Sequence, residues 1–149
     1  MKILVINGHP DKESFCQEIF RTIVENIDSN HHELESINLN EIDFDPVLRY
    51  GYRKRMEEDS FILRSQELIQ WADHFIFVYP IWWSSMPSLL KGWIDRVFTP
   101  GIAYSANNQG SFIWNYLRGQ QFKKLLKGKS ASIYACLLYT SDAADDSLR

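Results

Sequence analysis

The hydrophobic residues of this chain follow two spacings that alternate along the sequence. Short apolar runs with the length of strands are separated by longer segments in which apolar residues recur every three or four positions, which is typical of amphipathic helices. The runs that predict strands are Lys2 to Ile6, Leu34 to Leu39, Phe75 to Tyr79 and Lys127 to Ala135. The segments that predict helices are Phe15 to Ile27, Glu57 to Trp71 and Leu89 to Phe98.

This order of strands and helices predicts an α/β fold with a doubly wound parallel sheet and helices on both of its faces. We expect the strand order 2-1-3-4, with a fifth strand missing from the chain. In such a sheet the first and third strands are neighbours, and ligands bind beyond their carboxyl ends. The loops that follow these two strands are therefore expected to form one site.

Both of these loops have unusual sequences. The first runs from His9 to Ser14, and Ser14 is well placed to cap the helix that begins at Phe15. The free N–H groups at that helix end would face the site and favour an anion. The second loop follows Pro80 and contains Trp82 and Trp83. Since successive side chains of an extended segment point apart, these two indoles cannot both face the same core.

Composition narrows the possible functions. The chain has 149 residues, of which 45% are apolar, so we expect one domain with one substantial core. A net charge of −3 and the lack of a basic stripe argue against nucleic acid, and no apolar run is long enough for a membrane span. The first strand begins within two residues of Met1 and leaves no room for a signal peptide, so a cytoplasmic protein is expected.

Three motifs carry a resemblance to a known family. These are HPDKESF at residues 9–15, YPIWWSSMPSLLKGWIDRVF at residues 79–98 and GIAY at residues 101–104. In this order and spacing they resemble the NAD(P)H:quinone oxidoreductase family of flavodoxin-like flavoproteins. The resemblance covers roughly residues 1–135, which are therefore expected to form an incomplete flavodoxin-like flavin-binding domain.

The resemblance implies a role for each matching residue. The flavin phosphate or pyrophosphate would be held by His9, Ser14 and Phe15. The isoalloxazine ring would be held by Pro80, Ile81, Trp82, Trp83 and Ser84. Tyr104 matches a catalytic-site tyrosine on the substrate side of the flavin. These assignments follow from the family, and the helix N-terminus supports the first of them.

The implied activity is a two-step hydride transfer in which NAD(P)H reduces a bound FMN or FAD, and a quinone or similar small acceptor then takes the electrons. The resemblance also implies a homodimer. The alternative interpretation is a flavin-binding electron carrier or a regulatory flavoprotein subunit of a membrane transporter, and a third is the same fold without a cofactor. No metal site is expected, because Cys16 and Cys136 are far apart in the sequence and belong to no zinc-binding pattern.

The end of the chain departs from the family pattern. Residues 136–146, CLLYTSDAADD, are what the end of a transposon-based sequencing adapter encodes in one reading frame. We therefore expect residues 136–149 to be a non-native read-through tail, and the glycine loop that holds the flavin in the family to be absent.

Several conspicuous residues have simpler interpretations. Trp93 is expected to be packing within its helix. Cys16 is expected to be a small packed residue, although its place near a helix N-terminus would lower its pKa somewhat. In the long connection between Ser105 and Phe122, the residues Phe112, Trp114 and Tyr116 are candidates for a substrate rim.

Overall fold

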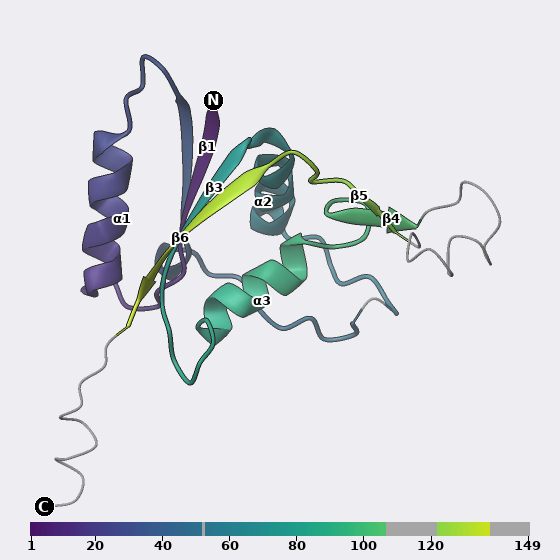
Figure 1. The fold of residues 1–149 in the computed structure, drawn as a ribbon. Helices are drawn as coiled ribbons and strands as arrows, with labels where there is room; N and C mark the ends of the chain where they lie inside the picture. The colour runs from purple at the N-terminus through teal and green to yellow at the C-terminus, as the bar shows by residue number, and fades with distance from the viewer. Residues whose placement is uncertain (52, 107–121, 138–149) are drawn as a thin grey trace, which may run out of the picture.

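A computed structural model describes residues 1–51, 53–106 and 122–137 of the chain. It contains a four-stranded parallel sheet with the order β2-β1-β3-β6 and a separate two-stranded antiparallel pair, β4 and β5 (Figure 1). The strands are β1 (Lys2–Asn7), β2 (Glu33–Asn38), β3 (His74–Pro80), β4 (Tyr104–Ala106), β5 (Phe122–Lys124) and β6 (Ser130–Cys136). The helices are α1 (Phe15–Asn26), the 3-10 turn η1 (Leu39–Glu41), α2 (Ser60–Trp71) and α3 (Ser88–Val97).

The predicted strand order is confirmed, and it follows from the burial of β1 on both faces. Leu4 and Ile6 point into a core formed with α2 and α3, whereas Ile3 and Val5 point into a second core under α1. Helices therefore cover both faces of the sheet, with α1 on one side and α2 and α3 on the other (Figure 1).

Capping residues set the start of the helices. The Ser14 side chain accepts a hydrogen bond from the backbone N–H of Gln17, and the Asp59 carboxylate accepts from the N–H groups of Phe61 and Ile62. Pro87 occupies the cap position of α3, directly before the first helical residue. The backbone of Pro87 itself is not yet helical, with φ −56° and ψ 147°.

The loop before α2 is held tightly against α3 at one point. A Cβ atom built on Gly92 would lie 2.5 Å from both the Cβ atom and the carbonyl oxygen of Pro46, so only glycine allows this approach. One helical turn later, the guanidinium of Arg96 donates a hydrogen bond to the carbonyl of Asp45. The first part of the loop, which we call the clamped segment (residues 43–46), is therefore fixed to α3.

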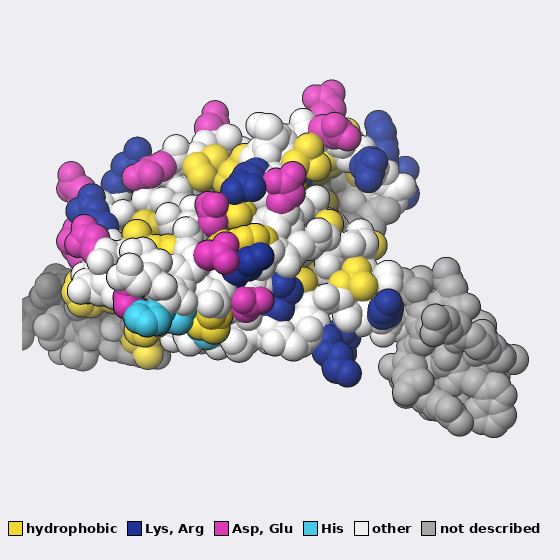
Figure 2. All heavy atoms as spheres, turned by 90° about the horizontal axis from the view of Figure 1, so that it is seen from above, with side chains coloured by type: hydrophobic (Ala, Val, Ile, Leu, Met, Phe, Trp, Pro, Cys, Tyr) yellow, Lys and Arg dark blue, Asp and Glu magenta, His cyan; other side chains and the backbone are white. Residues whose placement is uncertain are grey.

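The charges on one face of the molecule are mixed. Figure 2 shows acidic and basic side chains interspersed over the face seen from above, with no area of a single sign. That face offers no basic stripe for nucleic acid. None of the helices in residues 1–51, 53–106 and 122–137 is both long and apolar enough to cross a membrane.

Candidate functional site

The loops after β1 and β3 meet at one edge of the sheet. The two strands are parallel neighbours in which Asn7 is opposite Val78, so both loops leave the sheet at the same end (Figure 1). The rings of His9 and Trp82 lie edge to face, with centroids 5.4 Å apart and planes at 77°. The structure thus brings together residues of the two motifs that are more than seventy positions apart.

His9 has a defined tautomer. Its Nδ1 atom accepts a hydrogen bond from the backbone N–H of Asp11 at 2.9 Å, so the neutral ring carries its proton on Nε2. The side chain is only 9% exposed. This burial lowers the pKa of His9 below its ordinary value, although the charge and backbone hydrogen bond of Asp11 act in the opposite direction. His9 therefore offers one N–H donor while remaining neutral near pH 7.

We predict that His9 makes the protein less stable in mild acid. In the unfolded chain the imidazole regains its ordinary pKa of 6.5, so below that pH the unfolded state binds more protons than the folded state. The stability should therefore fall as the pH drops from about 7.5 to about 5.5, and His9→Gln should reduce this dependence. Urea unfolding at several pH values measures it. The exposed His31→Gln serves as a control, and an unchanged slope in His9→Gln would contradict the prediction.

A network of buried amides holds the His9 loop. Asn7 Nδ2 donates to Gln17 Oε1 at 2.8 Å and to Asn38 Oδ1 at 2.9 Å, while Asn7 Oδ1 accepts from the His9 N–H at 3.1 Å. Asn40 Nδ2 donates to Gln17 Oε1 at 2.9 Å and to the His9 carbonyl at 3.2 Å. The network joins the ends of β1 and β2, the start of α1 and the turn η1, so the loop is built into the fold.

The sequence interpretation missed this network. One signal was present, because Asn7 and Asn38 each follow an apolar run and end their strands opposite one another. The Oδ1 atom of Asn40 is buried and accepts no hydrogen bond from the described residues. A buried polar atom of this kind usually has a partner, so this acceptor is open to a water molecule or a ligand group.

Ser14 and Phe15 mark the N-terminus of α1. The Ser14 hydroxyl donates to the Asp11 carbonyl at 2.8 Å and accepts from the Gln17 N–H at 3.3 Å, so its main task is to cap the helix. Phe15, the first residue of α1, is 72% exposed, so its side chain lies largely in solvent at this end of the helix. The first backbone N–H groups of a helix have no partners within it, and together with His9 Nε2 they suit a phosphate group.

The tryptophan loop is a tight turn with an unusual backbone. Trp82 and Ser85 exchange two backbone hydrogen bonds of 2.9 and 3.0 Å, and the two residues between them have positive φ angles, 50° at Trp83 and 60° at Ser84. Left-handed conformations cost a residue with a side chain about 1–2 kcal/mol each. Strain of this kind is concentrated at ligand sites.

This turn presents its side chains to solvent. Trp83 is fully exposed and Trp82 is 42% exposed, whereas Pro80 is buried at the end of β3. Ile81 is half-buried and donates its N–H to the Cys136 carbonyl at 3.0 Å. The predicted ring-binding residues therefore divide into two that support the turn, Pro80 and Ile81, and three that it displays.

Tyr104 is not brought to this edge. It lies in β4, on the opposite side of the molecule from the loops after β1 and β3 (Figure 1), where its ring packs edge to face on Phe122 at 5.4 Å. The candidate rim residues Phe112, Trp114 and Tyr116 lie outside the described residues, as do residues 138–149 of the expected tail. Among the residues that the structure describes, the predicted flavin-site residues that come together are those of the two loops.

Two further expectations concern buried residues. Trp93 is fully buried, which confirms its packing role. Cys16 is also packed in the core, but the expected lowering of its pKa is wrong: burial, with the adjacent Cys136 thiol, raises the pKa of Cys16 to about 12. At this position, burial away from water raises the thiol pKa by more than the helix N-terminus lowers it.

No group of three or more potential metal ligands occurs within the part of the chain that the structure describes.

Comparisons with known proteins agree with this geometry. Residues 1–137 match the model of a protein family described as having a flavodoxin-like fold. A crystal structure of a Streptococcus mutans UA159 protein is 35% identical, with a TM-score of 0.74 over 98% of this chain and 73% of that one. The mouse ribosyldihydronicotinamide dehydrogenase [quinone] is 27% identical over 89% of this chain. An FMN-dependent NADH-azoreductase from Bacillus anthracis, 20% identical, shares the fold, with a TM-score of 0.65 over 95% of this chain and 72% of that one.

The chain is shorter than its curated relatives. It spans 66% of the mouse protein and 45% of a guinea-pig NAD(P)H dehydrogenase [quinone] to which it is 29% identical. Segments of those proteins therefore have no counterpart in this sequence.

Proposed function

Because this chain belongs to the flavodoxin-like fold family, we propose that it acts as a flavin-dependent NAD(P)H oxidoreductase on quinone-like acceptors. The observation that carries the proposal is the edge-to-face contact of His9 and Trp82 beside the N-terminus of α1. The contact brings the residue proposed to bind the flavin phosphate next to the loop proposed to bind the flavin ring. The names of the mouse and Bacillus proteins support the substrate class and the FMN cofactor.

The residues present fit a flavin at both ends. The neutral His9 ring offers its Nε2–H, and the first turn of α1 offers backbone N–H groups, which together favour a phosphate. The exposed indole of Trp83 provides an apolar surface for an aromatic ring system. A flavin bound there would supply the hydride chemistry, since it can accept a hydride from NAD(P)H and pass it to an acceptor.

The chain's own residues have supporting tasks in this proposal. The amide network fixes the position of His9. Ser14 caps α1 and so determines where the helix N-terminus lies. The turn with two positive φ angles displays the exposed Trp83 and Ser84 after the end of β3. Tyr104 remains a candidate for the substrate side, and its place on the far side of the same chain means that it would serve a site outside these two loops.

Some finer assignments belong to the same proposal. We retain a homodimer, a cytoplasmic location and a bound FMN or FAD as expectations from the family resemblance. Residues 1–135 remain the proposed flavin-binding domain.

A titration with flavin tests the proposal directly. FMN and FAD are added to the 149-residue chain while quenching of flavin fluorescence is measured, followed by oxidation of NADH and NADPH with a small quinone as acceptor. We expect saturable quenching, and Trp83→Ala should weaken flavin binding by about tenfold because it removes the exposed aromatic surface. Tyr50→Ala, which removes another exposed aromatic outside the two loops, should leave the affinity unchanged.

The outcomes separate the candidate functions. Binding with steady NAD(P)H oxidation supports the enzyme, whereas binding with very slow turnover favours an electron carrier. If neither flavin binds the chain or a longer form of the protein, the cofactor assignment is wrong.

A further inference from the structure

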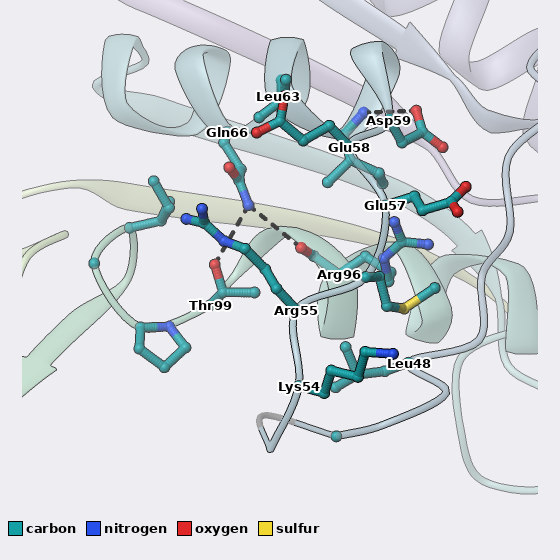
Figure 3. Close-up of a pocket in the computed structure, with 16 residues that line it drawn as sticks. Leu48, Lys54, Arg55, Glu57, Glu58, Asp59, Leu63, Gln66, Arg96 and Thr99 are labelled. Atoms are coloured by element: carbon teal, nitrogen blue, oxygen red, sulfur yellow. Dashed lines mark hydrogen bonds between the residues drawn. The ribbon is translucent and has the colours of Figure 1, made fainter.

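A hollow lies away from the two loops, between α2 and the end of α3. It has a volume of about 570 Å³, within the range of small-molecule sites. Its walls come from the loop around Lys54 to Asp59, from α2, from Arg96 and from the turn at residues 99–102 (Figure 3). None of the residues assigned to the flavin lines it.

The most unusual group in this hollow is the guanidinium of Arg96. The residue is only 7% exposed, and the bond that its side chain makes to the described residues goes to a backbone carbonyl, that of Asp45. No carboxylate of the described residues pairs with it within 4.0 Å. The hydrogen bond from the Val47 N–H, and then the charges of Arg49 and Arg96, lower the pKa of the Asp45 carboxylate, which is bonded to Arg49 at 2.7 Å and not to Arg96. The desolvation of the buried Arg96 cation is therefore only partly offset by attraction. Arg96 also lines a neighbouring hollow.

The rest of the lining is divided between apolar and polar groups. Apolar side chains form much of the wall: Leu48, Met56, Ile62, Leu63, Pro100 and Ile102. Arg55 reaches from the loop across the hollow toward Gln66 and Thr99, whose side chains are joined by a hydrogen bond of 3.3 Å (Figure 3). A ligand here would meet cations at one part of its surface and hydrocarbon at another.

We propose that this hollow binds a small aromatic carboxylate, with its carboxylate group on Arg96 and its ring against the apolar wall. A guanidinium matches a carboxylate through two parallel hydrogen bonds, which a buried fork-shaped donor favours. The volume is too large for a carboxylate group alone and accommodates one or two fused rings.

The acidic residues near the hollow restrict the charge of the ligand. Glu57 and Glu58 are exposed at its rim, while the Asp59 carboxylate is occupied with capping α2. These rim carboxylates would repel a doubly charged phosphate more than a single carboxylate. The site is thus suited to a monoanion with an apolar body.

The test uses the 149-residue chain and three probes in calorimetric titrations. The probes are 2-naphthoate, its neutral analogue 2-naphthalenemethanol and inorganic phosphate. We expect 2-naphthoate to bind at one site and at least about tenfold more tightly than the alcohol, because only the carboxylate pairs with Arg96. Phosphate should not bind there.

Two variants and one control locate the binding. Arg96→Met should reduce 2-naphthoate affinity at least about tenfold and leave the alcohol unaffected. Leu63→Trp fills the hollow, keeps the Arg96 contact to Asp45 and should abolish binding of both aromatic probes, so it remains informative if Arg96→Met does not fold. Arg64→Met removes the same charge from an exposed position of α2 and should change nothing.

Several results would overturn the proposal. These are the absence of saturable 2-naphthoate binding, equal affinity for the acid and the alcohol, retention of binding in Leu63→Trp, or an equal loss in Arg64→Met. Because flavin binding is followed separately by fluorescence, failure of this site and failure of the flavin site are distinguished.

Discussion

Replacing Trp93 with alanine should remove a large part of the stability of the protein. The indole is fully buried between α2, α3 and the sheet, packs edge to face on Phe98 at 6.0 Å and donates from Nε1 to the Ser65 hydroxyl at 3.1 Å. Truncating a buried Trp costs about 3–5 kcal/mol, against a total of about 5–15 kcal/mol for a natural domain. Urea unfolding followed by circular dichroism measures the loss.

Two comparisons separate packing from hydrogen bonding. Trp93→Phe keeps most of the volume but leaves the buried Ser65 hydroxyl without its donor, so adding Ser65→Ala should recover part of the loss. Leu63→Ala, at a partly exposed position of α2, should cost much less. A loss below about 1 kcal/mol in Trp93→Ala would show that the indole is not in the core described.

Replacing Asn7 with leucine should both destabilise the protein and weaken flavin binding. Leucine is similar in shape, but it leaves Asn38 Oδ1 and the His9 N–H without their partners in a fully buried position. Each lost partner costs about 1–3 kcal/mol, so the two together should lower the free energy of unfolding by about 2–6 kcal/mol. Release of the His9 loop should lower flavin affinity about tenfold.

The matched control for Asn7 is Asn26→Leu. Asn26 lies exposed on α1, where its amide donates only to the Thr22 carbonyl, so the same chemical change should have a small effect there. Equal losses of stability in the two variants would contradict the role given to the network.

The order of the main elements could be predicted from the sequence because each of them buries one periodic apolar face. The run from Phe75 to Tyr79 and the helical spacing of Phe15 to Ile27 reflect contacts that the fold contains. The pair β4 and β5 was not predicted, because each strand has three residues, too few to show a period. The pairing of these strands depends on tertiary contact instead.

The site was predictable only in part. The switch point of the sheet is determined by strand order, so the meeting of the His9 and Trp82 loops follows from topology. The roles of Gln17 and Asn40 could not be inferred, since these residues meet Asn7 only through the register of β1 and β2 and the position of α1. The raised pKa of Cys16 was also hidden, because the sequence does not show how deeply a first-turn residue is buried.

Because Gly92 lies directly against Pro46, the two parts of the loop before α2 differ in how well they tolerate insertions. The clamped segment has its backbone against the helix, so an added residue there, or any side chain at position 92, would force the two elements apart. Beyond it, residues 49–55 are exposed wherever the structure describes them, and their ends are held by the clamped segment and by the Asp59 cap. Lengthening a surface loop between fixed ends adds little entropy cost. This second part therefore tolerates a change of length that the clamped segment does not, provided that Lys54 and Arg55 keep their places in the wall of the hollow beside α2.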